Sequence, residues 1–152
     1  MIKRVHSLAG ALAMLVIATF WLSTALSELF GSRAMVIAVK TAIPWGFWLL
    51  IPALATAGAS GFALANGRRA GLIGAKLKRM RYIAGNGLLV LIPSALYLAA
   101  KARAGEFDSG FTLVQAVELI AGAVNLTLLG ANMRDGLALR SRLAQKPAAA
   151  AR

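Results

Sequence analysis

Four long uncharged runs constrain this chain more than any other feature of its sequence. They cover residues 5–27, 41–67, 82–100 and 119–133, and the last extends back to residue 111 if Glu118 is included. A helix needs about 17 to 25 mostly apolar residues to cross a bilayer. Hydrophobic residues make up 59% of the 152 residues, against roughly 45 to 50% in soluble domains. The sequence therefore predicts four membrane-spanning helices.

We expect one all-α domain, an integral membrane four-helix up-and-down bundle. Its predicted spans are residues 7–30, 41–64, 82–100 and 113–133, with a basic cytoplasmic loop at 66–81 and a frayed tail at 143–152. Short connections make neighbouring helices antiparallel. Pro52 and Pro93 lie inside spans, where each removes a backbone hydrogen bond and predicts a kink. Thr112 and Gln115 have the spacing of a capping box, which predicts the start of the fourth helix.

The positive charges are unevenly distributed, and their distribution predicts the topology. With the N-terminus inside, thirteen of the seventeen lysines and arginines fall on the cytoplasmic side. The other four are Arg33, Lys40, Lys101 and Arg103. This positive-inside bias predicts a multi-pass inner-membrane protein with both termini cytoplasmic. The net charge of +12 therefore indicates topology, with an anionic-lipid site as the alternative for residues 67–81, and no nucleic-acid partner is expected.

Polar residues recur along the fourth span at a seven-residue spacing. Glu118, Asn125 and Asn132 follow one another at this interval. Seven residues turn a helix by roughly 700°, which brings all three side chains to one face. A polar group that faces hydrocarbon is costly, so this face is predicted to point into the bundle.

Helical depth sorts the interior polar residues into two layers. Glu28 and Glu118 lie toward the outer ends of their helices, so we expect both carboxyl groups in an outer layer. The inner layer lies toward the cytoplasmic ends and contains His6, Asn66, Asn86 and Asn132. The arginines predicted to surround the inner layer are Arg4, Arg81 and Arg134.

The inner layer has the composition of a site for haem b. His6 offers a neutral imidazole to iron, apolar side chains suit the macrocycle, and arginines suit the propionates. The second axial ligand would be Met133 or Met80, or it would be absent, and we favour Met133. Asn86 and Asn132 are expected beside the haem, with Arg4, Arg81 and Arg134 near the propionates. The most specific predicted function is therefore one-electron transfer with an unidentified redox partner.

Three stretches of the chain carry a resemblance to known proteins. RVHSLAGALAMLVIATFWLSTALSELFGS, KLKRMRYIAGNGLLVLIPSALYLAA and ELIAGAVNLTLLGANMRDGL together resemble small uncharacterised four-span membrane proteins of bacteria. That resemblance implies the architecture and assigns no activity. The architecture is also similar to that of four-helix membrane b-type cytochromes, which hold haem between histidines on facing helices. His6 is the single histidine of this chain, which departs from that pattern.

Two other functions stay open at this point. In a structural or accessory subunit of a membrane complex, the polar residues would fix the helix register, each at about 0.6 to 2 kcal/mol. In an oligomeric proton or small-solute transporter, Glu28, Glu118 and Asn125 would lie on the transport path. An enzyme is not expected, because the sequence shows no nucleophile with a base, no metal-ligand cluster and no phosphate loop.

A ridge of small residues on the second span has two interpretations. Its members recur every four residues and are Ala53, Ala57, Gly61 and Ala65. Such ridges let another helix backbone approach closely. The ridge therefore predicts either packing within the bundle or a homo-oligomer interface, and the remaining partner is the lipid bilayer.

Overall fold

The computed structural model describes residues 1–65 and 71–149, which are helical over almost their whole length. The elements are α1 (Ile2–Phe30), α2 (Arg33–Ala65), α3 (Gly71–Asn86), the π-helical turn η1 (Gly87–Leu91), α4 (Ile92–Ala104) and α5 (Ser109–Ala149). The elements α3, η1 and α4 follow one another without a break and form one rod, Gly71–Ala104. Within this part of the chain, four rods are long and apolar enough to cross a membrane. The all-α prediction is confirmed.

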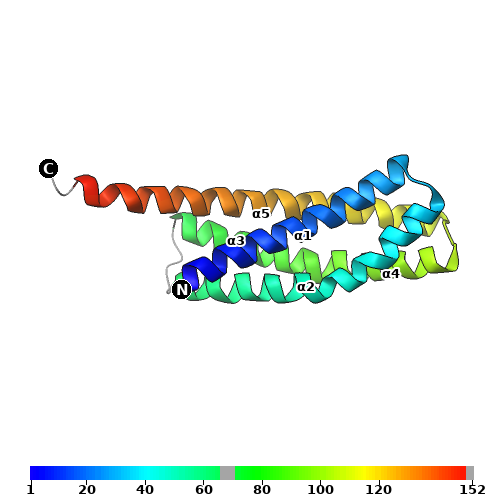
Figure 1. The fold of residues 1–152 in the computed structure, drawn as a ribbon, viewed down its shortest axis with the longest axis horizontal. Helices are drawn as coiled ribbons and strands as arrows, with labels where there is room; N and C mark the ends of the chain where they lie inside the picture. The colour runs from blue at the N-terminus through cyan, green and yellow to red at the C-terminus, as the bar shows by residue number, and fades with distance from the viewer. Residues whose placement is uncertain (66–70, 150–152) are drawn as a thin grey trace.

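The rods run up and down and close into one bundle (Figure 1). α1 packs along α2, and α2 packs against α4. α5 completes the ring, because it contacts α1 as well as α3 and α4. Both chain termini lie at one end, which we call the terminal end (Figure 1). The opposite end holds the α1–α2 and α4–α5 turns and is called the distal end.

Three predicted boundaries differ from the structure by two turns or more. α2 begins at Arg33, well before the predicted start at Thr41, so Lys40 lies inside a helix. α3 begins at Gly71, so most of the predicted basic loop is helical, while residues 66–70 lie outside the described part. α5 continues to Ala149, through most of the predicted tail. The first two errors have one cause: charged residues were taken as helix boundaries, although helices at a bundle end tolerate them. The frayed tail had been predicted from its low sequence complexity.

The predicted interruption at Pro93 takes the form of a π-helical turn. A proline ring clashes with the carbonyl group four residues earlier, here that of Leu89. The five residues of η1 end at Leu91, two positions before Pro93, and include Leu89. Wider π turns are one known way for a helix to absorb such a disturbance. α2, in contrast, continues as one helix through Pro52.

Two clusters of buried apolar residues stabilise the bundle at different depths. The central core contains Ala13, Val16, Ile17, Leu50, Ala53, Ile83 and Leu129. The distal core contains Val36, Leu98, Ala102 and Phe111. Outside these cores, large apolar side chains are exposed around the bundle; Trp45 and Trp48, for example, are 72% and 80% exposed. So large an exposed apolar surface marks contact with lipid or with another protein.

Side chains of α1 fit into notches that glycines leave on the neighbouring helices. A Cβ atom on Gly46 would lie 2.2 Å from the Phe20 ring, and one on Gly122 would lie 2.7 Å from the Trp21 ring. Glycine at these two positions therefore sets how closely α2 and α5 approach α1.

The predicted small-residue ridge lies inside the bundle, against α1. Ala53, Ala57 and Ala65 are at most 6% exposed. A Cβ atom on Gly61 would lie 3.0 Å from the His6 ring, so α1 covers this part of the ridge. Packing within the bundle therefore accounts for the spacing of the ridge.

Replacing Gly46 by alanine tests the notch for Phe20. The Phe20 ring cannot easily move aside, because it makes an edge contact with Phe47 at 6.2 Å between centroids. We expect Gly46→Ala to lower the free energy of unfolding in detergent by about 1 to 3 kcal/mol, as overpacking usually does. Gly58→Ala on the same helix is the control, since no atom lies within 4 Å of a Cβ there. Equal melting temperatures for the two variants would contradict the notch.

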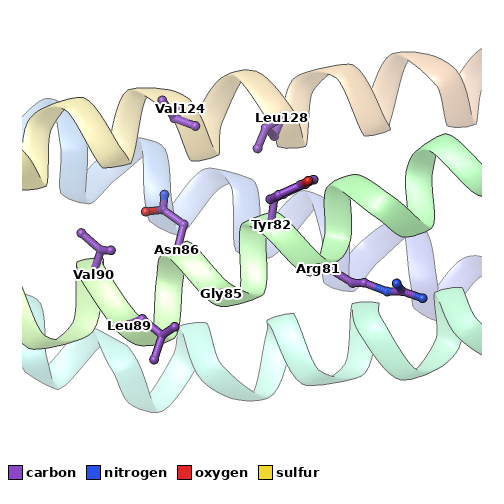
Figure 2. Close-up of a pocket in the computed structure, with 8 residues that line it drawn as sticks. All are labelled: Arg81, Tyr82, Gly85, Asn86, Leu89, Val90, Val124 and Leu128. Atoms are coloured by element: carbon purple, nitrogen blue, oxygen red, sulfur yellow. The ribbon is translucent and has the colours of Figure 1, made fainter.

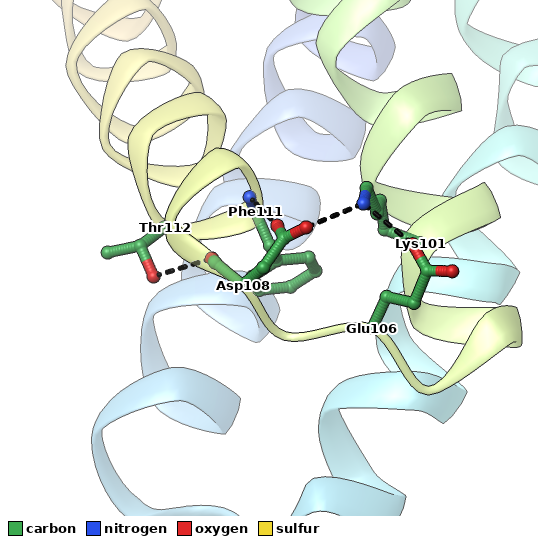
Figure 3. A network of polar contacts seen from close by, with 5 residues as sticks. All are labelled: Lys101, Glu106, Asp108, Phe111 and Thr112. Carbon is green, nitrogen blue, oxygen red and sulfur yellow. Dashed lines mark hydrogen bonds and ion pairs between the residues drawn. The ribbon is translucent and has the colours of Figure 1, made fainter.

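The α4–α5 turn is organised by Asp108 (Figure 3). One of its carboxylate oxygens accepts a hydrogen bond from the Phe111 backbone N–H at 2.9 Å, which caps the start of α5. The other oxygen accepts a hydrogen bond from the Lys101 ammonium at 2.7 Å. Lys101 also donates to Glu106 at 2.6 Å. These contacts tie the end of α4 to the start of α5.

The predicted capping box is therefore wrong. The Thr112 hydroxyl donates to the backbone oxygen of Asp108 at 3.2 Å, within the first turn of α5. Gln115 makes no capping contact and is buried at 6% exposure. The pattern was misleading because Asp108, one turn earlier, is a stronger helix cap than threonine.

The charge on Asp108 predicts a pH-dependent contribution to stability. The Lys101 hydrogen bond, followed by the Phe111 N–H, lowers the pKa of Asp108. Such a carboxylate stabilises the fold above its unfolded pKa of about 3.9 and loses this effect as the pH falls through its folded value. We expect Asp108→Asn, which keeps an oxygen acceptor, to melt slightly below the native protein at pH 7. The difference should vanish in acid.

Glu106→Gln is the matched control for this variant. Glu106 also pairs with Lys101, but it caps no helix. We expect a smaller change in melting temperature at pH 7. A difference between Asp108→Asn and the native protein that persists unchanged in acid would contradict the charge effect.

Candidate functional site

An ion pair between a fully buried lysine and a mostly buried glutamate joins α2 to α5. Lys40 is 0% exposed, and its ammonium donates to Glu118 Oε2 at 2.5 Å. The Glu118 side chain is 12% exposed. At about 1.5 Å per residue, Glu118 lies about 14 Å inside the start of α5. An ammonium at such a position is stable only with a carboxylate partner, because its transfer from water to an apolar medium is very costly.

A second carboxyl group lies near this pair, and the Gln115 amide lies one turn before Glu118 on α5. Glu28 on α1 is close enough to interact electrostatically with both Lys40 and Glu118. Within the described chain, Glu28 Oε1 is buried without a hydrogen-bond partner, and so are both polar side-chain atoms of Gln115. We call Glu28, Lys40, Gln115 and Glu118 the distal polar cluster. Its unused donors and acceptors can bind a small polar guest.

Apolar side chains enclose the cluster from both ends of the bundle. On the distal side, Val36 lies one turn before Lys40, and Phe111 lies one turn before Gln115; both belong to the distal core. On the other side, the Trp21 indole packs on Gly122 and donates to the Leu119 carbonyl at 2.8 Å. The low dielectric between these layers strengthens the ion pair and raises the cost of any unbalanced charge.

The charges of the cluster balance only in particular protonation states. One ammonium neutralises one carboxylate, so the cluster is neutral when the second carboxyl group carries a proton. Loss of that proton leaves one net negative charge in an enclosed apolar layer. A bound monovalent cation would restore neutrality, because buried charges need partners. The arrangement can therefore exchange a proton, or a proton for another small cation.

The predicted inward face of α5 is confirmed. Asn125, Asn132 and Leu129 are between 2% and 8% exposed, and they follow Glu118 along one side of the helix. This face carries polar groups toward the terminal end of the bundle. Leu129 interrupts it with an apolar side chain of the central core.

Asn86 and Asn125 form a separate middle layer. The Asn86 Nδ2 group donates to Asn125 Oδ1 and to the Ala121 carbonyl, both at 2.9 Å. The sequence placed Asn86 in the inner layer, and this depth is wrong. Because α3 begins at Gly71, Asn86 lies about 22 Å from the helix start. Its true partner is therefore on the middle of α5.

An ion pair between α3 and α5 forms the layer at the terminal end. Arg79 donates to Asp135 Oδ2 at 2.5 Å and to Asn132 Oδ1 at 3.3 Å. Asn132 Nδ2 is buried without a partner among the residues that the structure describes. Asn132 thus lies in the predicted layer, but it is bound by an arginine that the sequence did not single out.

His6 faces α2. Its Nδ1 lies 3.0 Å from the Ala57 carbonyl oxygen and 3.1 Å from Ser60 Oγ. A carbonyl oxygen only accepts hydrogen bonds, so Nδ1 donates and the lone pair of Nε2 remains available. An imidazole with this hydrogen bond can serve as a metal ligand. A six-coordinate haem would also need a second ligand on the side of the iron opposite His6.

Met133 does not lie opposite His6. It is 49% exposed and lines a groove of about 380 Å³ with α1 residues that include Ala11, Leu15 and Ala18. At 100° per residue, these positions lie roughly 120 to 180° around α1 from His6. The His6 side chain therefore leaves α1 on one side, whereas Met133 contacts another side of the same helix. The predicted axial pair is not brought together.

The other predicted haem residues are also spread over the bundle. Arg4, Arg81 and Arg134 are all exposed near the terminal end, as expected. Arg134 lies 3.8 Å from Asp135, and Arg81 lines a groove between α3 and α5. The Asn86 amide group donates its hydrogen bond to Asn125. These residues are too widely separated to hold a six-coordinate haem in this structure.

Comparison of the chain with protein-family models, curated proteins and solved structures finds no match. Among the residues that the structure describes, no group of three or more His, Cys, Asp or Glu side chains could hold a metal ion. The distal polar cluster is therefore the candidate site, on the basis of its geometry alone.

Sequence reasoning missed Lys40 and Gln115 in this cluster, and Arg79 and Asp135 at the terminal end. One signal for Lys40 was present. Two carboxyl groups predicted in one interior layer need a cation at the same depth, and Lys40 is the basic residue that directly precedes the second apolar run. Extending that helix by two turns would have placed it inside.

The buried pair predicts strong coupling between Lys40 and Glu118. Lys40→Met leaves Glu118 without its cation, and Glu118→Gln leaves Lys40 without its carboxylate. We expect each variant to lose about 3 to 5 kcal/mol of stability, as broken buried pairs do. The double variant should lose much less than the sum, because neither charge remains. Additive losses in a detergent unfolding assay would show that the two side chains do not interact.

Proposed function

We propose that this chain is a four-span protein of a bacterial inner membrane that carries protons or another monovalent cation through the distal polar cluster. The observation that carries the proposal is a fully buried ammonium that binds one carboxylate, with a second carboxyl group near both. Ionisable groups at such depth in a membrane bundle are expensive and commonly mark transport paths. The homo-oligomer expected for so small a transporter is part of the proposal.

The charge distribution supports the membrane orientation. The basic residues described at the terminal end are Lys3, Arg4, Lys76, Lys78, Arg79, Arg81 and Arg134. Four of the five carboxyl residues of the chain lie toward the distal end: Glu28, Glu106, Asp108 and Glu118. Under the positive-inside rule, the terminal end is cytoplasmic and both termini are inside.

Glu28 is the proposed proton carrier. In the neutral cluster, Lys40 and Glu118 stay ionised and Glu28 holds a proton. Glu28 lies two residues before the end of α1, so its proton has a short way to water at the distal end. When it releases the proton there, the cluster gains one negative charge and attracts the next cation. Lys40 donates its hydrogen bond to Glu118, so it positions that carboxylate rather than carrying the proton.

The polar face of α5 offers a continuation toward the cytoplasm. It passes the Asn86–Asn125 pair and reaches Asn132 and Asp135. Leu129 closes this route in the present conformation, since it belongs to the central core. Transport would therefore require a movement that separates α5 from its neighbours at this depth, as in alternating access.

A structural role is the second candidate, and one observation favours it. Each polar layer links α5 to another rod: Glu118 to α2, Asn125 to α3 and Asp135 to α3. Such links define register and rotation in a bundle that lacks a hydrophobic drive between helices. A scaffold or accessory subunit would keep the same links and conduct nothing.

Proton flux into proteoliposomes tests the transport proposal. The protein is reconstituted with a pH-sensitive dye inside, and a potassium gradient with valinomycin supplies the driving force. We expect flux well above that of protein-free liposomes, and we expect Glu28→Gln to reduce it at least tenfold, because glutamine cannot exchange a proton. Repeating the assay with a sodium gradient identifies the preferred cation.

Glu106→Gln is the matched control, since it removes an exposed carboxyl group at the same end of the bundle. Its flux should equal that of the native protein. Native flux no higher than in protein-free liposomes, for both cations, would overturn the proposal. In that case, large losses of stability in the Lys40 and Glu118 variants would support the scaffold.

A further inference from the structure

A groove runs along the outside of the bundle between the α3–η1 segment and α5 (Figure 2). It has a volume of about 550 Å³. Its walls include Leu89 and Val90 from η1, together with Val124 and Leu128 from α5. Arg81 and Tyr82 line its end nearer the terminal end of the bundle (Figure 2). The groove therefore has a charged end at Arg81 and mostly apolar walls.

We infer that this groove binds one anionic phospholipid, with an acyl chain between α3–η1 and α5 and the phosphate at Arg81. The inference rests on the membrane placement proposed above, but it does not depend on transport. It concerns a face of the bundle that the distal polar cluster does not use.

The shape of the groove suits a single chain. Gly85 forms part of its floor, and no atom lies within 4 Å of a Cβ placed there. Asn86 also borders the groove, but its amide nitrogen is bound to Asn125 and Ala121. Little polar surface is therefore left to repel a hydrocarbon chain.

The length of the groove matches one leaflet of a bilayer. Arg81 and Val90 are nine residues apart, which is about 14 Å along the helix. The hydrocarbon core of one leaflet is about 15 Å thick, half of the bilayer value. With Arg81 at headgroup depth, the other end of the groove reaches the middle of the membrane.

The charge at the mouth favours an anionic headgroup. Arg81 is exposed, and no carboxylate lies within ion-pair distance of it in the described part of the chain. A guanidinium group binds phosphate through two parallel hydrogen bonds. Lys78, one turn away, is also exposed and adds positive potential. Anionic lipids are attracted to such basic clusters at the cytoplasmic surface, whereas zwitterionic lipids carry no net charge.

Native mass spectrometry of the detergent-purified protein tests this inference. The protein is titrated with phosphatidylglycerol and, separately, with phosphatidylcholine of the same acyl chains. We expect the first phosphatidylglycerol to bind at least fivefold more tightly than phosphatidylcholine. Arg81→Gln should abolish this preference, whereas Lys78→Gln, which alters a charge outside the groove, should keep most of it.

Gly85→Leu tests the acyl-chain half of the site. Leucine at this position would fill the groove while leaving Arg81 in place, so binding of both lipids should weaken at least fivefold. A melting curve confirms that the variant is folded, and Arg81→Gln supplies independent evidence if it is not. Native-like binding by Arg81→Gln, equal affinities of the native protein for both lipids, or occupation of this face by a second copy of the chain would overturn the inference. Because the assay uses detergent and measures no flux, its failure is distinguishable from failure of the transport proposal.

Discussion

The Lys40–Glu118 ion pair constrains the rest of the bundle. A fully buried ammonium has to meet a carboxylate at the same depth, which fixes the axial position of α2 against α5. It also fixes the rotation of α5, because Glu118 has to point inward. Once that rotation is set, Asn125 and Asn132 follow on the same face.

Contacts between the rods then alternate along the bundle between polar and apolar layers. The distal polar cluster lies between the distal core and the central core, and the Asn86–Asn125 pair lies beside the central core. Where helices have little hydrophobic drive to associate, such hydrogen bonds and close packing select one arrangement. The notches at Gly46 and Gly122 contribute the packing, since each accepts an aromatic ring from α1.

Helical periodicity made part of this arrangement predictable. The inward face of α5 follows from the seven-residue spacing alone, because that spacing repeats in any regular helix. Depth was less predictable, since it depends on where a helix begins. Asn86 was misplaced and Lys40 overlooked because charged residues had been taken as helix ends, whereas α2 and α3 both include them.

Which face of a helix meets which neighbour could not be predicted from one sequence. His6 and Met133 have suitable depths for a shared ligand, and that much follows from helix lengths. The order of the rods around the bundle decides the rest: His6 contacts α2, whereas Met133 lies beside the opposite side of α1. Gln115 was missed because its spacing from Thr112 suggested a helix cap. In the structure Asp108 caps that helix.

The pairing of carboxyl groups with cations distinguishes one carboxyl residue from the others. The chain has five carboxyl residues. Glu106 and Asp108 bind Lys101, Glu118 binds Lys40, and Asp135 binds Arg79. In the described part of the chain, Glu28 alone has no hydrogen-bonded cation. Protonation of any other carboxyl group would break a pair between rods or at a turn. Glu28 can gain or lose a proton with the fold's ion pairs intact, so the charge of the distal polar cluster can change while the bundle that encloses it stays assembled.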